Sequence, residues 1–465
     1  MSKPNIIFVI CDDLGINDLC CYGRTDHNTP NLDTLAAQGM RFTSAYASQA
    51  ICSASRAGLL TGLNPARLHL TTYLPGRPNT MAQRVLHPEI TMHVPLSVKT
   101  FPHYFKEAGY VTGFIGKWHI GTNPGPAEHG FDHVYYPGNV EGRNTTPSET
   151  EGGKAEYELT QETIKFIEMN KNRPFVAYLG HYTPHIPYTA KQRLIDKNTN
   201  AFEPVYAALI ETLDNTIGIL MSKLEELQLA ENTIVVFTSD NGGLHVPEAL
   251  HDKITHNTPY RAGKGYTYEG GQRVPLIVRW PGHVPKGRVV DACVNNIDWI
   301  PTLLQLAGTP TPSGLDGVSF ADGLTGGLFP ERPLYWHFPH YTNQGGRPSG
   351  AMRDGNWLLV ERYDEDKVEL YDLALDIGQK QDVAHQYPDR VASMLTALTK
   401  WRNANNVQYN KPNPNCDEKE FARLYIDIDP SKFDPVVATK EEWARIREWK
   451  KSMYVVFRKG LGLEE

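Results

Sequence analysis

Hydrophobic and polar positions form two kinds of segment over roughly the first 300 residues. Short apolar runs rich in β-branched residues predict buried strands at 5–11, 110–115, 174–179, 233–238 and 274–279. Segments with helical spacing of apolar residues lie between them, at 30–39, 96–108, 156–170 and 201–227. Strands that alternate with helices are typical of a sandwich around a large, mainly parallel sheet. We therefore predict an α/β fold.

The pattern changes near residues 309–333, where Pro and Gly are frequent in a way that is typical of turns and linkers. Beyond it, the sequence predicts short strands at 357–360 and 368–371, a helix at 389–402, a polar tail from Asn403 and a charged helix near 440–451. We therefore predict a catalytic domain over residues 1–330 and a smaller C-terminal α+β subdomain over residues 331–465.

Composition and charge exclude several classes of protein. The 465 residues include 40% hydrophobic and 21% charged residues, which is typical of a folded globular protein, and the net charge is −7. Lys and Arg are not clustered, so we expect no nucleic-acid partner. The early apolar run at 6–11 is too short to cross a membrane, so we expect no membrane partner. We expect a cytoplasmic protein if the chain is complete, and a periplasmic or secreted one if an export signal has been removed.

Two polar pairs follow predicted strands. Asp12 and Asp13 end the strand at 5–11, and Asp240 and Asn241 follow the strand at 233–238. Ligands of open α/β sheets bind beyond the carboxyl ends of strands, so these pairs can converge. Four hard oxygen donors suit Ca²⁺ or Mg²⁺ and do not suit zinc. Taken alone, such a pair is more often a helix cap or a turn.

A predicted helix begins at Cys52 and carries Arg56 one turn inside. A helix N-terminus favours anions and lowers the pKa of a thiol, so Cys52 occupies a position suited to a reactive group. On this segment alone, a buried structural cysteine is at least as good an interpretation. None of the six cysteines has CxxC spacing, so the sequence indicates neither a zinc ribbon nor a disulfide scaffold.

Motifs in order over most of the chain resemble the sulfatase family, the formylglycine-dependent enzymes of the alkaline phosphatase superfamily, which include aryl and carbohydrate sulfatases. Cys52-Ser-Ala-Ser-Arg56 followed by Ala-Gly-Leu-Leu-Thr-Gly resembles the signature that a maturase oxidises to Cα-formylglycine, whose hydrate is the nucleophile. The resemblance extends to the segments at 5–15, 116–119, 184–185, 239–243, 263–275, 352–359 and 369–373. It implies an alkaline-phosphatase-like fold and a sulfuric ester hydrolase.

The resemblance also implies roles for individual residues. One calcium ion per chain would be bound by Asp12, Asp13, Asp240, Asn241 and the formylglycine made from Cys52. Arg56 would orient the hydrate, and Lys117, His119, His185 and Lys264 would surround the sulfate. The cations would neutralise sulfate oxygens, and His185 or Lys264 would protonate the leaving alcohol, with His185 favoured. Once one hydroxyl of the hydrate carries the sulfo group, His119 would deprotonate the other, so that the aldehyde reforms and expels sulfate. Without the resemblance, His119 is more often a packed histidine and Lys264 a solvated charge.

The signature departs from its common form at Ala54, where proline is usual, which leaves open the type of maturase. The remaining loops mix His, Tyr, Trp and Arg, which fits a sugar ring, and we expect an exo-acting carbohydrate sulfatase with a sulfated sugar or aryl sulfate as substrate. We expect Trp336, His337 and His340 on loops over the pocket mouth. The alternatives are a phosphomonoester or phosphonate ester hydrolase of the same superfamily and a catalytically silent carbohydrate-binding relative.

Overall fold

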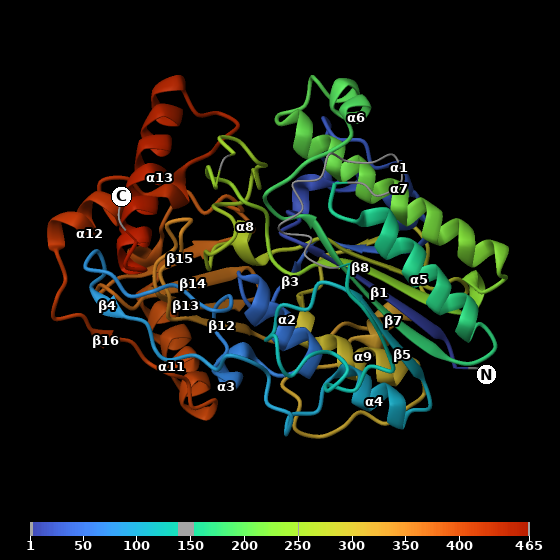
Figure 1. Cartoon of the computed structure of the whole chain (residues 1–465). Coiled ribbons are helices and arrows are strands. Elements are labelled where there is room, and N and C mark those ends of the chain that lie inside the picture. The colour runs from blue at the N-terminus through green and yellow to red at the C-terminus, as the bar shows by residue number, and fades with distance from the viewer. Residues whose placement is uncertain (1–2, 138–152, 250, 464–465) are drawn as a thin grey trace.

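A large and a smaller sheet, both with helices packed against them, form the core of the protein (Figure 1). The structure is a computed structural model that describes residues 3–137, 153–249 and 251–463. The larger sheet has eight strands in the order β10-β2-β9-β8-β1-β7-β5-β6. They are β1 (Asn5–Asp12), β2 (Met40–Phe42), β5 (Val111–Gly116), β6 (His133–Tyr135), β7 (Phe175–Pro184), β8 (Thr233–Ser239), β9 (Leu276–Arg279) and β10 (Arg288–Val290).

Most neighbouring strands of this sheet are parallel, which confirms the predicted mainly parallel sheet. Strand β9 is the exception, because it runs antiparallel to both β8 and β2. The apolar pattern at 274–279 predicted this strand but not its direction, since side chains alternate with the same period in either direction.

Alternate residues of the central strand β1 enter two separate cores, which is why its sequence is apolar throughout. Phe8 packs with α2 (Cys52–Thr61), α4 (Phe101–Glu107) and α9 (Trp299–Leu306). Val9 packs on the opposite face. The helices there are α1 (Pro30–Gln38), α5 (Glu156–Asn170) and α7 (Pro204–Glu226). In Figure 1 the two sets of helices lie on opposite sides of the sheet.

Helix α4 is shorter than the segment 96–108 that the sequence predicted. It begins at Phe101 because Thr100 is its N-cap and forms a capping box with His103. The Thr100 hydroxyl also donates to the carbonyl of His129 at 2.7 Å, which fixes the chain entering the helix.

The smaller sheet is antiparallel, in the order β12-β13-β14-β15. Its strands are β12 (Leu334–Phe338), β13 (Ser349–Asp354), β14 (Trp357–Arg362) and β15 (Val368–Asp372). One face packs on α11 (Pro388–Ala404), and the other packs against Tyr46, Tyr266 and Tyr268 of the larger part. This confirms the predicted second α+β unit. The boundary at residue 330 lies between the two sheets and stays a prediction.

The C-terminal helices pack on each other and on the rest of the protein, where they share a core with Ala82, Val246 and Tyr341. Helix α13 (Lys440–Gly460) extends beyond the charged stretch that predicted it and packs on α12 (Glu418–Tyr425). Its buried residues are Trp443, Ile446, Trp449 and Met453, spaced by three or four along one face. The remaining short elements are β3 (Ala45–Tyr46), β4 (Val85–Leu86), β11 (Val294–Asn295), β16 (Lys411–Pro412), α3 (Pro65–Leu68), α6 (Gln192–Lys197), α8 (Glu269–Gln272) and α10 (Ala321–Leu324).

Over the described ranges, the protein has no helix that is long and apolar enough to cross a membrane.

Candidate active site

The two polar pairs meet at the carboxyl edge of the large sheet. Strands β1 and β8 are parallel neighbours in a register that pairs Cys11 with Ser239, so Asp12 and Asp13 lie beside Asp240 and Asn241. The Asp13 amide donates to Asp240 Oδ1 at 3.1 Å, and Asn241 Nδ2 donates to Asp13 Oδ1 at 2.8 Å. The convergence expected from the sequence is therefore present.

Helix α2 begins at Cys52, which lies within electrostatic reach of Asp12 and Asp13. All ten of its residues are buried. Arg56, one turn inside, donates from Nε to Asp240 Oδ2 at 2.7 Å and from a terminal nitrogen to the Lys117 carbonyl at 3.0 Å. The side chain that the sequence placed one turn behind Cys52 thus connects the helix to both β8 and the end of β5.

Four basic side chains complete the cluster, and three of them contact the acidic pair. Lys117, just after β5, donates from Nζ to Asp12. Lys264 Nζ lies 2.7 Å from Asp13 Oδ2, and His185 Nε2 lies 3.7 Å from the same oxygen. His119 Nε2 lies 3.4 Å from the Leu74 carbonyl, and the ring lines a cavity together with Lys117. The structure thus brings Lys117, His185 and Lys264 together against Asp12 and Asp13.

Burial and charge together determine the ionisation of the carboxylates. Burial opposes ionisation of Asp12, but the charges of Lys117 and Arg56 outweigh it and hold the pKa of Asp12 well below its usual range. Burial, with repulsion from Asp12, raises the pKa of Asp240 to about 8 although Arg56 opposes it. A further cation beside these carboxylates would stabilise the ionised form of Asp240.

The pKa of the His185 imidazole lies well below its usual value. Burial is the main cause, and the positive charges of Lys117 and Lys264 lower the pKa further. Nδ1 lies 2.5 Å from the Ile186 carbonyl, which can only accept a hydrogen bond. The neutral ring therefore carries its proton on Nδ1, and Nε2, the atom facing Asp13, is unprotonated.

Some of these side chains have oxygen atoms that make no hydrogen bond within the described residues and could bind a hard cation. Asp12 Oδ1 and Asn241 Oδ1 are buried and have no hydrogen-bond partner among the described residues. Ligand atoms of Asp12, Asp13 and His185 lie within 4.8 Å of one another. Because carboxylate and amide oxygens predominate in this cluster, the donor set fits Ca²⁺ or Mg²⁺ better than zinc.

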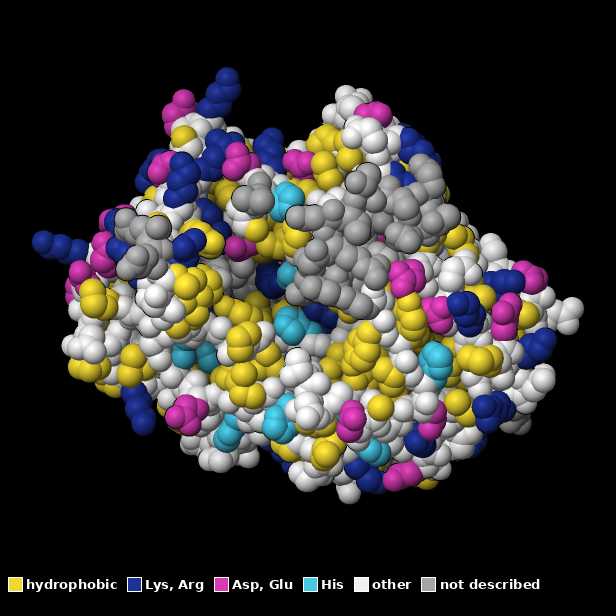
Figure 2. Space-filling view, in the orientation of Figure 1, with side chains coloured by type: hydrophobic (Ala, Val, Ile, Leu, Met, Phe, Trp, Pro, Cys, Tyr) yellow, Lys and Arg dark blue, Asp and Glu magenta, His cyan; other side chains and the backbone are white. Residues whose placement is uncertain are grey.

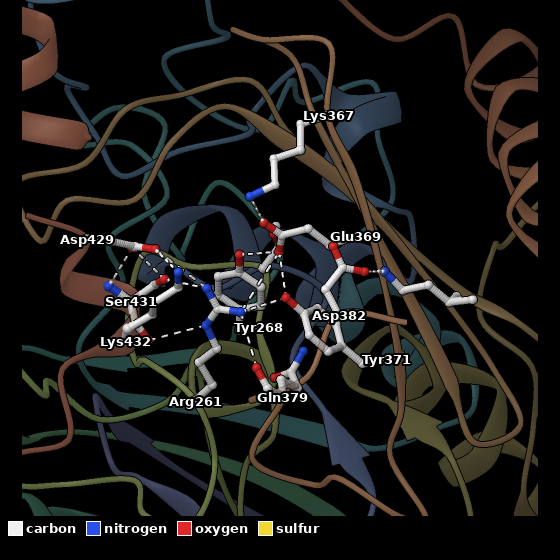
Figure 3. Close-up of polar contacts among 12 residues, drawn as sticks. Arg261, Tyr268, Lys367, Glu369, Tyr371, Gln379, Asp382, Asp429, Ser431 and Lys432 are labelled. Carbon is white, nitrogen blue, oxygen red and sulfur yellow. Dashed lines mark hydrogen bonds and ion pairs between the residues drawn. The ribbon is translucent and has the colours of Figure 1, made fainter. Parts of the chain in front are cut away.

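The loop that carries Lys264 is anchored to the C-terminal part of the chain through Arg261 (Figure 3). The Arg261 guanidinium stacks 3.8 Å from the centre of the Tyr268 ring and donates to the Tyr371 hydroxyl at 2.7 Å and to Ser431 Oγ at 2.8 Å. Tyr371 belongs to β15 and Ser431 to the segment before α13, so three parts of the chain fix this loop.

A cavity of about 480 Å³ opens beside the cluster and is lined by Lys117, His119, Leu74, Pro75, Tyr136 and Tyr182. A second hollow of about 410 Å³, lined by Arg77 and His87, shares Pro75 and Met92 with it. Figure 2 shows Lys or Arg and His side chains inside a hollow near the centre of the face shown. Such a basic hollow suits an anionic ligand.

The expectation that Trp336, His337 and His340 lie on loops over the pocket mouth was wrong in part. Trp336 and His337 lie within β12 and are 0% and 1% exposed, so they are not on loops over the pocket mouth. The Trp336 indole donates to the Ala47 carbonyl at 2.8 Å and packs in the interface between the sheets. His340 lies after the strand but is buried against His87 and Thr71.

Sequence reasoning assigned no role to Tyr73, although it lies close to Cys52. Its neighbour Leu74 donates its amide to the Ser53 hydroxyl at 3.0 Å, which joins the Tyr73 segment to the start of α2. Burial is the main cause that raises the pKa of the Tyr73 phenol, which lies within electrostatic reach of Cys52 and Lys264. A tyrosine in a loop without regular pattern gives no sequence signal for this position.

Comparison with known families decides the assignment. The family described as Sulfatase matches residues 4–309, and the C-terminal family of N-sulphoglucosamine sulphohydrolase matches residues 262–404. The chain belongs to the sulfatase family. The suspected resemblance is thereby confirmed, and the chain is a sulfatase enzyme.

Named relatives and solved structures are consistent with this family. The N-acetylgalactosamine-6-O-sulfatase of Bacteroides thetaiotaomicron is 30% identical over 85% of this sulfatase and 93% of its own length, and human arylsulfatase A is 33% identical over 76% and 74%. The crystal structure of Ps i-CgsB has a TM-score of 0.74 at 30% identity and covers 86% of this chain and 93% of that one. A related crystal structure holds that protein with k-i-k-neocarrahexaose.

A more distantly related enzyme has the same fold. The phosphonate monoester hydrolase of Agrobacterium radiobacter has a TM-score of 0.66 at 18% identity and covers 87% of this chain and 96% of that one, which shows the shared fold alone. The alkaline-phosphatase-like fold class predicted from the sequence is thus confirmed.

Proposed function

We propose that this sulfatase releases inorganic sulfate from sulfated carbohydrates, with formylglycine made from Cys52 as the nucleophile. One observation carries the proposal: Cys52 is buried at the N-terminus of α2, beside an acidic cluster and two buried lysines. Burial raises the pKa of the Cys52 thiol although Lys264 and Lys117 oppose it, so an unmodified thiol would be a poor nucleophile here. Formylglycine would supply a hydrated aldehyde with two hydroxyl groups at that position.

The acidic cluster would hold one calcium ion. Asp12, Asp13, Asp240 and Asn241 are its proposed protein ligands, and the buried oxygens of Asp12 and Asn241 that lack partners among the described residues support this. Calcium bound there would act as a Lewis acid toward a sulfate oxygen. Arg56, paired with Asp240 at 2.7 Å, would keep that carboxylate in place.

The basic residues would bind the sulfate group and move protons. Lys117 and Lys264 are buried, and for both, burial is outweighed by nearby carboxylates that raise the pKa, so both are cationic. They would neutralise sulfate oxygens. His119, which lines the cavity, is the proposed base that deprotonates the second hydroxyl once the first carries the sulfo group, so that the aldehyde reforms and sulfate leaves.

His185 is the proposed proton donor to the leaving alcohol, as the resemblance favoured. Its neutral ring holds a proton on Nδ1 only, so it must gain one on Nε2 before it can donate there. The negative charge of a bound sulfate ester would raise the imidazole pKa and favour that gain. Lys264 is the alternative donor.

The substrate is proposed from the relatives. Relatives named N-acetylgalactosamine-6-sulfatases, together with a related structure that holds a neocarrahexaose, support a sulfated sugar as substrate. We therefore propose N-acetylgalactosamine 6-sulfate at a chain end as the first substrate to assay. The maturase partner and exo action are parts of the same proposal.

A direct comparison of esters tests the function. The full chain, co-expressed with a formylglycine-generating maturase, is assayed with 4-nitrophenyl sulfate, 4-nitrophenyl phosphate and a panel of sulfated mono- and disaccharides. We expect sulfate release to exceed phosphate release on the order of a hundredfold or more in kcat/KM. Preference for the phosphate would favour the phosphomonoesterase alternative, and absence of turnover in a fully converted sample would favour the silent binding protein.

A further inference from the structure

Glu248 is held in one orientation by two residues from distant parts of the chain. Its Oε2 accepts from Gln344 Nε2 at 2.6 Å and from Lys450 Nζ, on α13, at 2.7 Å. Lys450 Nζ also donates to the Asn343 carbonyl at 2.6 Å. Both side chains of the ion pair are largely buried, with 15% of Glu248 and 11% of Lys450 exposed. All of the side-chain hydrogen bonds that Glu248 makes within the described residues use Oε2, which leaves the other oxygen, Oε1, without one.

The same face of α13 contacts Arg77, which lines the second hollow beside the active site. Met453, three residues after Lys450, contacts a terminal nitrogen of Arg77 through its sulfur at 3.2 Å, and Arg77 also donates to the Tyr425 hydroxyl at 2.9 Å. Residues three apart on a helix are neighbours on its surface. Glu248 and Arg77 are therefore held by adjacent positions of one helix.

Arg77 is joined to the nucleophile position by a short stretch of chain. Leu74, three residues earlier, bonds to Ser53 next to Cys52, and its carbonyl lies 3.4 Å from His119 Nε2. The Tyr73 phenol is within electrostatic reach of Arg77, Glu248, Cys52 and Lys264. Glu248 and Lys264 are thus both near Tyr73, and within the described part of the chain Glu248 makes no contact with the proposed calcium ligands.

This part of the chain lies outside both family matches. The second match ends at residue 404, whereas α12 and α13 lie at 418–425 and 440–460. A role for Lys450 therefore cannot be read from the family, and it rests on the contacts above.

We propose that α13 completes the sugar-binding wall of the active site, with Glu248 as the residue that binds hydroxyl groups of the sulfated sugar. Lys450 and Gln344 are positioning residues that keep Oε2 occupied and leave Oε1 to accept from the sugar. This inference rests on the proposed carbohydrate sulfatase function.

The chemistry of the carboxylate defines the preferred sugar. A carboxylate accepts hydrogen bonds from neutral hydroxyls and repels a second anionic group at the same place. The sugar that fits carries one sulfate in the cluster of Lys117 and Lys264 and free hydroxyls toward Glu248. A ring with a second sulfate on that side would be rejected.

Two substrates separate sugar recognition from catalysis. Matured full-length protein is assayed with N-acetylgalactosamine 6-sulfate, or the preferred monosulfated sugar of the panel, and with 4-nitrophenyl sulfate, which has no sugar hydroxyls. For Glu248→Gln, which keeps the shape of the side chain, we expect kcat/KM for the sugar to fall about 10–100-fold, mainly through KM. The loss for the aryl sulfate should be at least tenfold smaller.

Substitutions on the helix test the positioning role. Lys450→Met should shift KM for the sugar in the same direction as Glu248→Gln, and Lys450→Arg should recover part of the loss because it can still donate to Glu248. Lys451→Met is the matched control, since Lys451 is 72% exposed and pairs only with Glu448 at the surface among the described residues. It should change neither reaction.

Two results would overturn the inference: equal losses on both substrates, which indicate a structural role, or an unchanged KM for the sugar in Glu248→Gln. Failure of the proposed function is distinct, because the wild-type protein would then hydrolyse neither ester. Failure of this inference leaves the wild type active on both.

Discussion

Arg56 shows how one side chain can support both stability and catalysis. Its guanidinium is fully buried and donates to Asp240, which is itself fully buried. Removing one partner of a buried ion pair leaves an uncompensated charge, which typically costs about 3–5 kcal/mol. We expect Arg56→Met to lower the free energy of unfolding by about that amount in urea titrations.

A matched control for this loss is Arg67→Met. Arg67 pairs with Asp316 at 3.0 Å, but its side chain is 45% exposed. We expect a change of less than about 1 kcal/mol there, because solvent screens the pair. Equal losses in the two variants would contradict the account of Arg56.

The basic cluster gives a second prediction at the residue scale. Lys117, His119, His185 and Lys264 are proposed to act on charge that shifts as the sulfate ester bond breaks. Replacing any one with Ala should lower kcat on the order of a hundredfold or more, as measured by sulfate release. Lys432→Ala serves as a control, since Lys432 is 71% exposed and lies 3.8 Å from Asp429. A set of variants with wild-type kcat would contradict these roles.

At the scale of elements, the Lys264 loop depends on Arg261. The guanidinium is largely buried and bonds to Tyr371, Ser431 and the Gln379 carbonyl. Arg261→Met should lower the free energy of unfolding by about 2–4 kcal/mol and lower kcat through movement of Lys264. Hydrogen exchange should become faster in residues 257–264. Faster exchange throughout the protein, with none specific to this loop, would contradict the positioning role.

Elements were predictable where local pattern determines them. The strand at 5–11 and the helix at 156–170 follow from their apolar periodicity, and α5 has the predicted bounds. The antiparallel direction of β9 was not predictable, because it depends on the chain path between strands. The burial of Trp336 and His337 in β12 was missed for a related reason: aromatic residues near Pro and Gly are typical of loops as well as of strand ends.

Within the candidate site, only the residues that belong to sequence motifs could be predicted. The sheet brings Asp12 and Asp240 together because both follow parallel strands, a rule that needs no tertiary information. Glu248 and Lys450 lie far apart in sequence and meet only because α13 packs back on the larger part. No spacing rule predicts such a contact.

At the scale of the whole molecule, buried neutral histidines determine the response to acid. Burial lowers the pKa of His181 to about 3 and, with Arg77 adding to burial at His87, those of His87, His245 and His337 to about 4. Below the usual histidine pKa of about 6.5, the unfolded chain binds protons that the folded chain does not. The contribution of these buried neutral histidines to the free energy of unfolding is therefore fully present above about pH 6.5. It is lost as the pH falls toward 4.

Urea titrations between pH 7.5 and about 4.5 test this response. Each such histidine contributes a slope of up to about 1.4 kcal/mol per pH unit once its unfolded form is protonated. In His181→Gln, the slope of the free energy of unfolding against pH should be smaller by about the contribution of one histidine. A free energy of unfolding that stays constant over this range would contradict the buried neutral state.

The central claim is that turnover requires a modified Cys52 at the N-terminus of α2. The most direct test measures, on one set of samples matured to different extents, both the fraction of the Cys52 peptide in which CH₂SH has become an aldehyde and the rate of sulfate release. The account predicts a rate proportional to the converted fraction and no activity in Cys52→Ala. A rate independent of conversion, or undiminished activity in Cys52→Ala, would contradict it.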